Sequence, residues 1–324
     1  MYFHLMKQLQ FLLILLFSSL AFSQTYFILD AKEKTPVSFA TISFGDGRGT
    51  FAGAEGEFNF PKDKYADIDS IFISSIGYKE LGLSTSAIPK KIMITPETNQ
   101  LSEVIVTAPK RGKFKKRTLD PTTHTDYFSC WLPTVESEVA VLFNRYEGQS
   151  SKIAKLLLPI NSEKKYRKKG NLKFSTLFRI QFYANDNGKP GAPIQYGDIV
   201  FNVNQDNDEI YELDLNRFNV FIPETGIFAS LQVLGYADPK GKLLQNKKYN
   251  EVKTRRGIEK ISTTFRPLLP FTAALPSQQT FVRRVFFNNK KWQIFDKSYN
   301  ENSKLIQTGQ NNYGMGSILH VYKD

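Results

Sequence analysis

Cysteine and histidine are scarce in this sequence of 324 residues, which contains one cysteine and three histidines. Because a disulfide needs two cysteines, Cys130 cannot form one within the chain, and no part of it is predicted to be a disulfide scaffold. We expect Cys130, next to Trp131, to occupy a buried apolar position. A disulfide to another chain is the alternative.

The sequence also lacks the motifs that carry catalysis. Neither His124 nor His320 begins a His-x-x-Glu or His-Glu-x-x-His pattern, so no zinc site of the metallocarboxypeptidase type is predicted. A Gly-x-Ser-x-Gly elbow and a phosphate-binding glycine-rich loop are missing as well. We therefore predict no catalytic, cofactor-binding or metal-ligating residue, and we expect the chain not to be an enzyme.

Two alternatives to this prediction stay open. A glycosidase needs two suitably spaced carboxylates, and Asp198, Asp214 and Glu224 are candidates for such a pair. The acidic segments Asn185–Gly188 and Asn204–Glu209 offer oxygen ligands for calcium. Neither segment matches the full calcium-loop pattern, and their composition is typical of plain turns.

Long apolar runs are confined to the N-terminus. Phe11–Phe17 is almost entirely apolar, Lys7 precedes it, and Ala21 and Ser23 are small residues shortly before Gln24. This pattern predicts a signal peptide over 1–23, cleaved between Ser23 and Gln24. The alternative is a membrane anchor, although the run is shorter than the ~20 residues of a membrane span. We expect an exported protein in the periplasm, at the outer-membrane periphery or secreted.

Turn residues and short alternating segments dominate the remaining sequence. Aromatic residues make up 14% of the chain and are mostly Phe and Tyr, which favour strands. Helical periodicity is almost absent, and only Val135–Tyr146 is left open between helix and strand. The predicted fold is all-β, with several short strands per domain. The expected order is a signal peptide over 1–23, a small transthyretin/Ig-like β-sandwich over 24–109, a basic linker over 110–128, and a larger jelly-roll-like β-sandwich over 129–324.

Four motifs of the first domain follow one another in a recognisable order. They are Pro36–Ile42, Gly53–Phe58, Ile76–Lys79 and Leu101–Ala108. Together they resemble the carboxypeptidase-regulatory-like domain, a transthyretin-like sandwich often found at the N-terminus of TonB-dependent receptors. The resemblance covers about a quarter of the chain and implies a sandwich and an envelope location, but no reaction. The rest of the chain lacks the repeated amphipathic strands of a membrane barrel, so no plug and barrel are expected.

A second resemblance enters in the C-terminal domain. Its segments are Phe178–Tyr183, Asn185–Gly191, Tyr211–Leu215 and Ile222–Gly226. They look like the C-terminal sandwich of secreted two-domain proteins that carry the same N-terminal module, and that sandwich is similar to the jelly rolls of carbohydrate-binding modules. This resemblance implies architecture and no activity.

Gly77 breaks a β-branched and aromatic run just before Tyr78. We expect Gly77 to adopt a backbone conformation that disfavours a side chain, and Tyr78 to pack at the edge of the first sandwich.

Positive charge is in excess and clustered. The formal net charge is +12, with basic runs at Lys110–Arg117 and Lys164–Lys169. In an exported protein such runs favour anionic envelope polymers or lipid headgroups over nucleic acid. The candidate polyanion contacts are Lys113, Lys115, Lys116 and Arg117. The alternative is a solvated linker that contacts nothing.

The functional prediction is a non-catalytic exported envelope protein with a binding or assembly role through its β-sandwich modules. An envelope protein or a glycan is the expected partner, with possible peripheral association with the outer membrane and no nucleic acid. The alternatives are a secreted carbohydrate-active enzyme and a structural spacer of a surface complex. An exposed aromatic strip would indicate glycan stacking. Its candidate members are Trp131, Tyr183, Tyr196, Tyr211, Tyr236 and Trp292.

Overall fold

The computed structural model describes residues 25–97, 112–162, 174–246, 250–254, 257–261, 267–275 and 280–323. The predicted signal peptide, its cleavage site at Ser23 and Gln24, and the expected strand Val104–Thr107 lie outside these ranges. Within them most residues belong to β-strands, and the α-helices α2 (Lys297–Asn300) and α3 (Lys304–Gln307) are single turns. The predicted all-β sandwich architecture is therefore confirmed. In the part of the chain that is described, no helix has the length and apolar character needed to cross a membrane.

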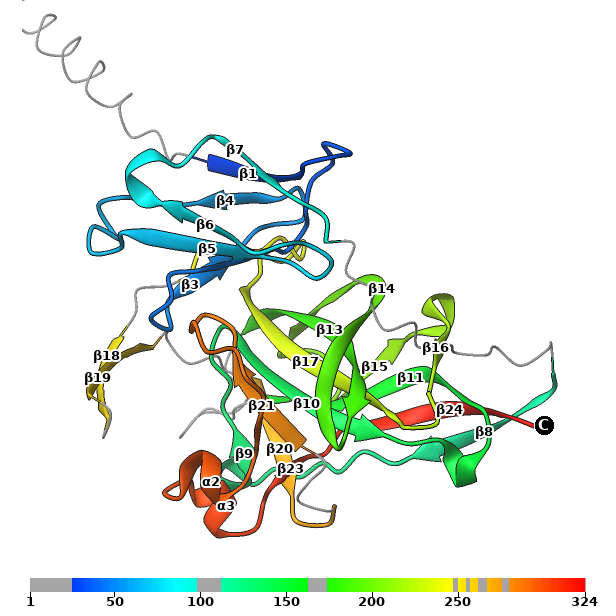
Figure 1. The fold of residues 1–324 in the computed structure, drawn as a ribbon. Coiled ribbons are helices and arrows are strands. Elements are labelled where there is room, and N and C mark those ends of the chain that lie inside the picture. Colours follow the sequence, from blue (N-terminus) through cyan, green and yellow to red (C-terminus); the bar gives the residue numbers. More distant parts are fainter. Residues whose placement is uncertain are drawn as a thin grey trace, which may run out of the picture.

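Residues 25–97 form a small sandwich, which we call the first module and which is drawn in blue and cyan in Figure 1. One sheet has the order β4-β1-β7 and the other β3-β2-β5-β6. The strands are β1 (Thr25–Asp30), β2 (Thr41–Ser43), β3 (Gly49–Phe51), β4 (Glu57–Asn59), β5 (Ser70–Ser74), β6 (Leu81–Ser84) and β7 (Lys91–Ile94), with the 3-10 helix η1 (Thr85–Ala87). Ile28, Ile42, Phe58 and Ile71 meet in the core between the sheets.

Residues from 112 onwards form a larger sandwich, the second module. Its first sheet has the order β14-β13-β17-β10-β21-β22, and its second has the order β15-β11-β24-β8 with β16 beside β11. The first sheet comprises β10 (Ser137–Phe143), β13 (Ser175–Asp186), β14 (Lys189–Asn204), β17 (Ile227–Tyr236), β21 (Thr280–Arg284) and β22 (Gln293–Ile294). The second comprises β8 (Phe114–Leu119), β11 (Ser151–Pro159), β15 (Ile210–Asp214), β16 (Val220–Phe221) and β24 (Gly316–Tyr322).

Smaller elements complete this module. They are β9 (Cys130–Trp131), β12 (Asn161–Ser162), β20 (Pro267–Thr272), β23 (Asn312–Tyr313), the hairpin β18 (Asn250–Thr254) with β19 (Gly257–Ile261), and the 3-10 helices η2 (Tyr127–Ser129), η3 (Tyr146–Gly148) and η4 (Asn216–Phe218). The core between the two large sheets includes Val139, Leu156, Phe178, Leu231 and Leu319.

The segment whose type the sequence left open is strand β10. Val139, Val141 and Phe143 enter the core between the sheets, and the alternate residues Ala140 and Leu142 pack in a separate cluster on the opposite face. Both faces of this strand are buried, so the apolar pattern runs continuously and hides the period of two.

Residues 114–119 differ from the expected linker, because they form β8 at the edge of the second sheet. β8 pairs antiparallel with β24 in a register that places Lys116 opposite His320. All six residues of β8 are exposed. Edge strands often carry charged side chains, which discourage pairing with other chains. The same charges made this strand look like a solvated linker.

The two modules are in direct contact, with the first module above the six-stranded sheet in Figure 1. The carbonyl oxygen of Phe286 accepts hydrogen bonds from Ser43 Oγ at 2.7 Å and from the amide nitrogen of Gly47 at 3.2 Å. Phe51 of the first module packs on the Phe286 ring, with centroids 5.0 Å apart. Asn246 donates to the carbonyl oxygen of Gly49 at 2.9 Å. Phe51 thereby joins the core of the second module.

Gly77 has the backbone conformation that its position in the sequence predicted. Its φ is +83°, in the left-handed region that a side chain disfavours. Tyr78 follows it, half-buried and packed against the core of the first module. Both residues lie at the edge of the first module that faces β14, because a Cβ on Gly77 would meet the side chain of Gln195.

Candidate functional site: a cleft between the modules

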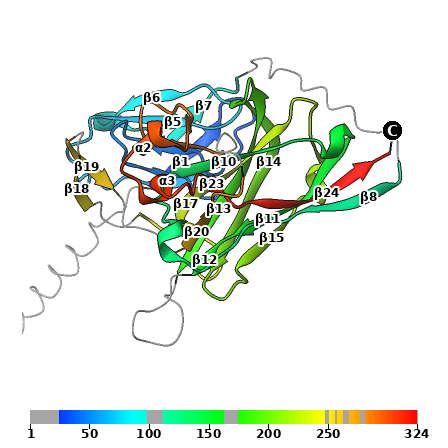
Figure 2. The same cartoon turned by 90° about the horizontal axis from the view of Figure 1, so that it is seen from below.

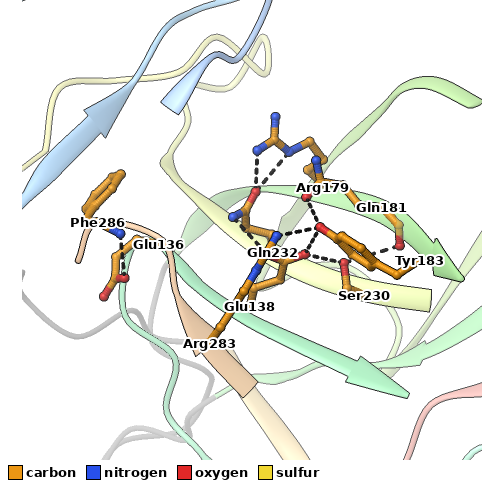
Figure 3. A network of polar contacts seen from close by, with 9 residues as sticks. All are labelled: Glu136, Glu138, Arg179, Gln181, Tyr183, Ser230, Gln232, Arg283 and Phe286. Carbon is orange, nitrogen blue, oxygen red and sulfur yellow. Dashed lines mark hydrogen bonds and ion pairs between the residues drawn. The ribbon is translucent and has the colours of Figure 1, made fainter. Parts of the chain in front are cut away.

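A row of buried polar side chains crosses the six-stranded sheet on the face opposite the main core. Arg179 on β13 is the cross-strand partner of Gln232 on β17, Gln232 of Glu138 on β10, and Glu138 of Arg283 on β21. Directly opposite residues project from the same face of a sheet, so the register alone aligns the four side chains. Figure 3 shows them with their neighbours.

Glu138 is the acceptor at the centre of this row and is 0% exposed. One carboxylate oxygen accepts from Tyr183 Oη at 2.8 Å and from Ser230 Oγ at 2.6 Å. The other lies 2.7 Å from Arg283 Nε and 3.5 Å from Gln232 Nε2. A buried carboxylate is tolerated when a cation and several donors meet it, and Glu138 has both.

Arg179 connects the row to the first module. Its Nε donates to Gln232 Oε1 at 3.0 Å, and its Nη1 donates to the carbonyl oxygen of Phe39 at 2.9 Å. The guanidinium also lies 5.7 Å from the centre of the Phe51 ring. Burial lowers the pKa of Arg179 from its usual value, and Glu138 opposes that effect. A guanidinium has five N–H groups. The hydrogen bonds that Arg179 makes to the described residues do not use all of them, so some N–H donors remain for a ligand.

Beside Arg179 lies a cleft of about 280 Å³, which we call the junction cleft. Both modules line it: Pro36–Ser38 and the Ser75–Tyr78 turn from the first, β13 and β14 from the second. Its polar side chains include those of Ser38, Gln181, Gln195, Tyr78, Arg179 and Asp198, and Tyr196 adds a second aromatic ring. The lining of the cleft therefore combines donors, acceptors and two phenol rings.

The titratable groups of the cleft are perturbed by burial. Desolvation raises the pKa of Asp198, and the positive charge of Arg179 opposes it. Burial, the hydrogen bond to Asp30 and the negative charges of Asp30 and Asp198 raise the pKa of Tyr78 to about 12. Burial likewise raises the pKa of Tyr196 to about 12. Both phenols are thus neutral hydrogen-bonding groups at physiological pH, with Tyr78 Oη donating to Asp30 at 2.9 Å.

The three carboxylates proposed as a glycosidase pair do not converge. Asp198 lines the junction cleft. Asp214 ends β15 in the other sheet, where the Asn216 backbone amide holds its pKa below the usual value. Glu224 lies in the turn after β16 and pairs with Arg145 at 3.3 Å.

The two segments considered for calcium use their side chains to stabilise turns. Asn185 Oδ1 accepts from the amide of Gly188 at 2.8 Å, and Asn204 Oδ1 accepts from the amide of Asp206 at 2.8 Å. Within the described ranges no group of three or more His, Cys, Asp or Glu residues is placed to hold a metal ion.

The four basic candidates lie at or beside β8 and do not form one cluster. Successive residues of a strand point to opposite faces, so Lys116 faces away from Lys115 and Arg117. Lys113 precedes the strand. Arg117 lies over the Tyr146 ring at 5.3 Å.

The aromatic candidates are mostly packed against other groups. Tyr183 is buried, and the Trp292 ring lies 4.4 Å from the Arg283 guanidinium. Trp131 packs against the main core. Tyr196 is the member of that set that lines the junction cleft.

The remaining candidates hold the structure together. Cys130 is buried as expected, and burial, with the nearby charge of Asp126, raises the pKa of its thiol to about 12. His124 contacts the carbonyl oxygen of Phe271 at 2.8 Å, so residues near it are attached to the second module.

Sequence reasoning missed the polar row itself. The signal is present as alternating polar residues, Arg179, Gln181 and Tyr183 on one strand and Ser230 and Gln232 on another. Taken alone, each sequence indicates an ordinary strand with one buried apolar face and one solvent-exposed polar face. Only the register between strands shows that these positions meet in a buried row.

Comparisons with known proteins give little further guidance. No protein-family model matches the chain, and no curated protein matches it. A solved structure of the clostridial cysteine protease Cwp84, after propeptide cleavage, is similar at 9% identity and a TM-score of 0.34, covering 92% of this chain and 70% of that one. A similarity of this strength carries no argument about fold or activity.

Proposed function

We propose that this chain is a non-catalytic, exported envelope protein that binds a short glycan segment in the junction cleft. The observation that carries the proposal is the cleft itself, which both modules line and whose lining includes Arg179, Asp198, Tyr78 and Tyr196. The proposal includes that the first module is of the carboxypeptidase-regulatory-like kind and that a signal peptide directs export.

The chemistry of the cleft favours a glycan over a partner protein. Sugar hydroxyls donate and accept, and the cleft supplies carboxamides, a carboxylate and spare guanidinium donors. Tyrosine rings pack well against the apolar faces of sugars. Its volume of about 280 Å³ lies just below the ~300–1,000 Å³ typical of small-ligand sites. A short segment fits such a space better than the broad surface of a folded partner.

A glycan array probed with the purified chain and with two variants tests this proposal. Asp198→Asn removes a charged acceptor, and we expect it to weaken binding about 10-fold or more, since hydrogen bonds to charged groups contribute about 1.5–3 kcal/mol. The matched control is Asp206→Asn, which removes an exposed carboxylate in a turn remote from the cleft. Binding that both variants leave unchanged would contradict the proposal.

The same experiment separates binding from catalysis. Mass spectrometry of the recovered glycan should show an intact ligand. Hydrolysed products that disappear in Asp198→Asn would instead support the carbohydrate-active enzyme. Cell fractionation with N-terminal sequencing tests export: we expect a chain that begins at Gln24, and intact Met1 in a cytoplasmic pool would contradict it.

A further inference from the structure

We propose that the outward face of the second sheet binds an anionic polysaccharide, at a site separate from the junction cleft. We call this surface the basic–aromatic face. It consists of Phe114 and Lys116 on β8, Lys152 on β11, Phe221 on β16, and His320 and Tyr322 on β24. Figure 2 shows β8 and β24 side by side at the end of the molecule where the C-terminus lies, away from the first module.

The register of the sheet aligns these side chains. Phe221 is opposite Lys152, Lys152 is opposite His320, and His320 is opposite Lys116. The row therefore crosses four strands on one face. That face points away from the core, because the neighbouring residues Ile153, Leu319 and Val321 are the ones buried between the sheets.

Aromatic rings accompany the cations. Phe114 stacks on His320 with centroids 3.8 Å apart and an interplanar angle of 14°. The ring of Tyr322 packs against those of Phe114 and Phe221, and the ring centroids are 5.8 Å apart in each pair. Phe114 is 43% exposed, and His320 covers one side of its ring, so the other side is what it offers to a ligand.

Two lysines and one carboxylate, Asp214, act on His320 at the centre of this face. Lys152 and His320 are each only 9% exposed. Lys152 Nζ donates to the neutral Asn219 Oδ1 at 3.3 Å, and Asp214 is a carboxylate close enough to interact with Lys152. Burial and the positive charges of Lys152 and Lys116 lower the pKa of His320, and Asp214 only partly opposes them. His320 Nδ1 is buried without a hydrogen-bond partner among the described residues.

A linear anionic glycan matches this arrangement better than a small ion. Lys152 and Lys116 are separated by the intervening strand β24, which corresponds to a backbone separation of ~10 Å, two strand spacings. The rings lie beside and between these cations. Acidic groups at regular intervals would meet the lysines while sugar rings stack on Phe114 and Tyr322, and release of counterions would add affinity.

Calorimetric titration of the purified chain with dextran sulfate, and with neutral dextran of equal length, tests this site. We expect binding of the sulfated polymer only, and Lys116→Gln should weaken it about 5-fold, since a lysine near an anionic surface contributes ~1 kcal/mol. Lys115→Gln is the matched control, because it removes the same charge one residue away on the other side of β8. It should change the affinity little.

A second readout is the pKa of His320, followed by NMR. Bound sulfates would offset the charges of Lys116 and Lys152, so the pKa of His320 should rise when dextran sulfate is present. Equal losses in Lys115→Gln and Lys116→Gln, or a His320 pKa that dextran sulfate does not move, would overturn the proposal. Tighter, Lys116-dependent binding of a single-stranded oligonucleotide would overturn it in favour of nucleic acid.

Discussion

Glu138 illustrates how much of this fold rests on single buried groups. Its carboxylate receives hydrogen bonds from Tyr183, Ser230 and Gln232 and an ion pair from Arg283. Arg283 in turn donates to Tyr183 Oη at 2.6 Å, which closes the network. Because these donors converge on one carboxylate, its removal takes the counter-charge from Arg283 and weakens several buried contacts at once.

Replacement of Glu138 should therefore be costly. We expect Glu138→Leu to lower the free energy of unfolding by about 3–5 kcal/mol, as when one partner of a buried ion pair is removed. Glu138→Gln keeps one acceptor and should cost less. Denaturant unfolding measures both, with Glu224→Gln as control, since its surface ion pair contributes about 0–1 kcal/mol. A Glu138→Leu protein as stable as the control would show that the network contributes little.

Gly77 offers a second test of how a single residue contributes to stability. Its φ of +83° is strained for a β-branched residue, so Gly77→Val should cost on the order of 1–3 kcal/mol. The comparison is Gly82→Val, because Gly82 lies in β6 with an ordinary φ and a Cβ there would make normal contacts with Phe72. Equal unfolding midpoints for the two variants would show that the backbone conformation is not the constraint.

Among the elements, β8 departs most from expectation, and its pairing can be probed by limited proteolysis. A strand must leave its ladder before a protease can cut it, so trypsin should act slowly after Lys115, Lys116 and Arg117. Lys240, in the exposed turn between Asp238 and Lys242, should be cut earlier. Rapid cleavage within β8 would indicate that this segment behaves as the linker its composition suggests.

The elements that the sequence predicted are those with a strong local pattern. Ile199–Val203 is in β14, Ile210–Leu215 matches β15, and Gly226–Leu234 matches β17 within a few residues. β8 was missed because its charges mask the alternation. The junction cleft was missed for another reason: Tyr78 and Asp198 are far apart in sequence, and only the docking of the modules brings them together.

At the scale of the whole molecule, Glu136 lies next to the contact between the modules. It is buried, pairs with Arg284 at 2.6 Å, and accepts from the amide of Phe286 at 3.4 Å. The Phe286 carbonyl is the acceptor for Ser43 and Gly47 of the first module. Burial raises the pKa of Glu136 from 4.5 to about 7, against the opposing charge of Arg284.

A carboxyl with a raised pKa holds its proton in the folded state while the unfolded chain has lost it. Its contribution to stability should therefore fall as pH rises from about 4.5 to about 7, the interval set by the two pKa values of Glu136. We expect the free energy of unfolding of the wild type to decline across that interval relative to that of Glu136→Gln. Above the interval, the two curves of free energy against pH should run parallel. Parallel profiles throughout would mean that Glu136 titrates normally.

If the two modules form one ligand site between them, a bound glycan should protect both sides of the cleft, and hydrogen exchange measures that protection. The full chain would be compared with and without a glycan identified on the array. We expect slower exchange in both Ser75–Tyr78 of the first module and Ile194–Ile199 of the second, the two sides of the cleft. Protection confined to one of these segments, or located elsewhere, would contradict it.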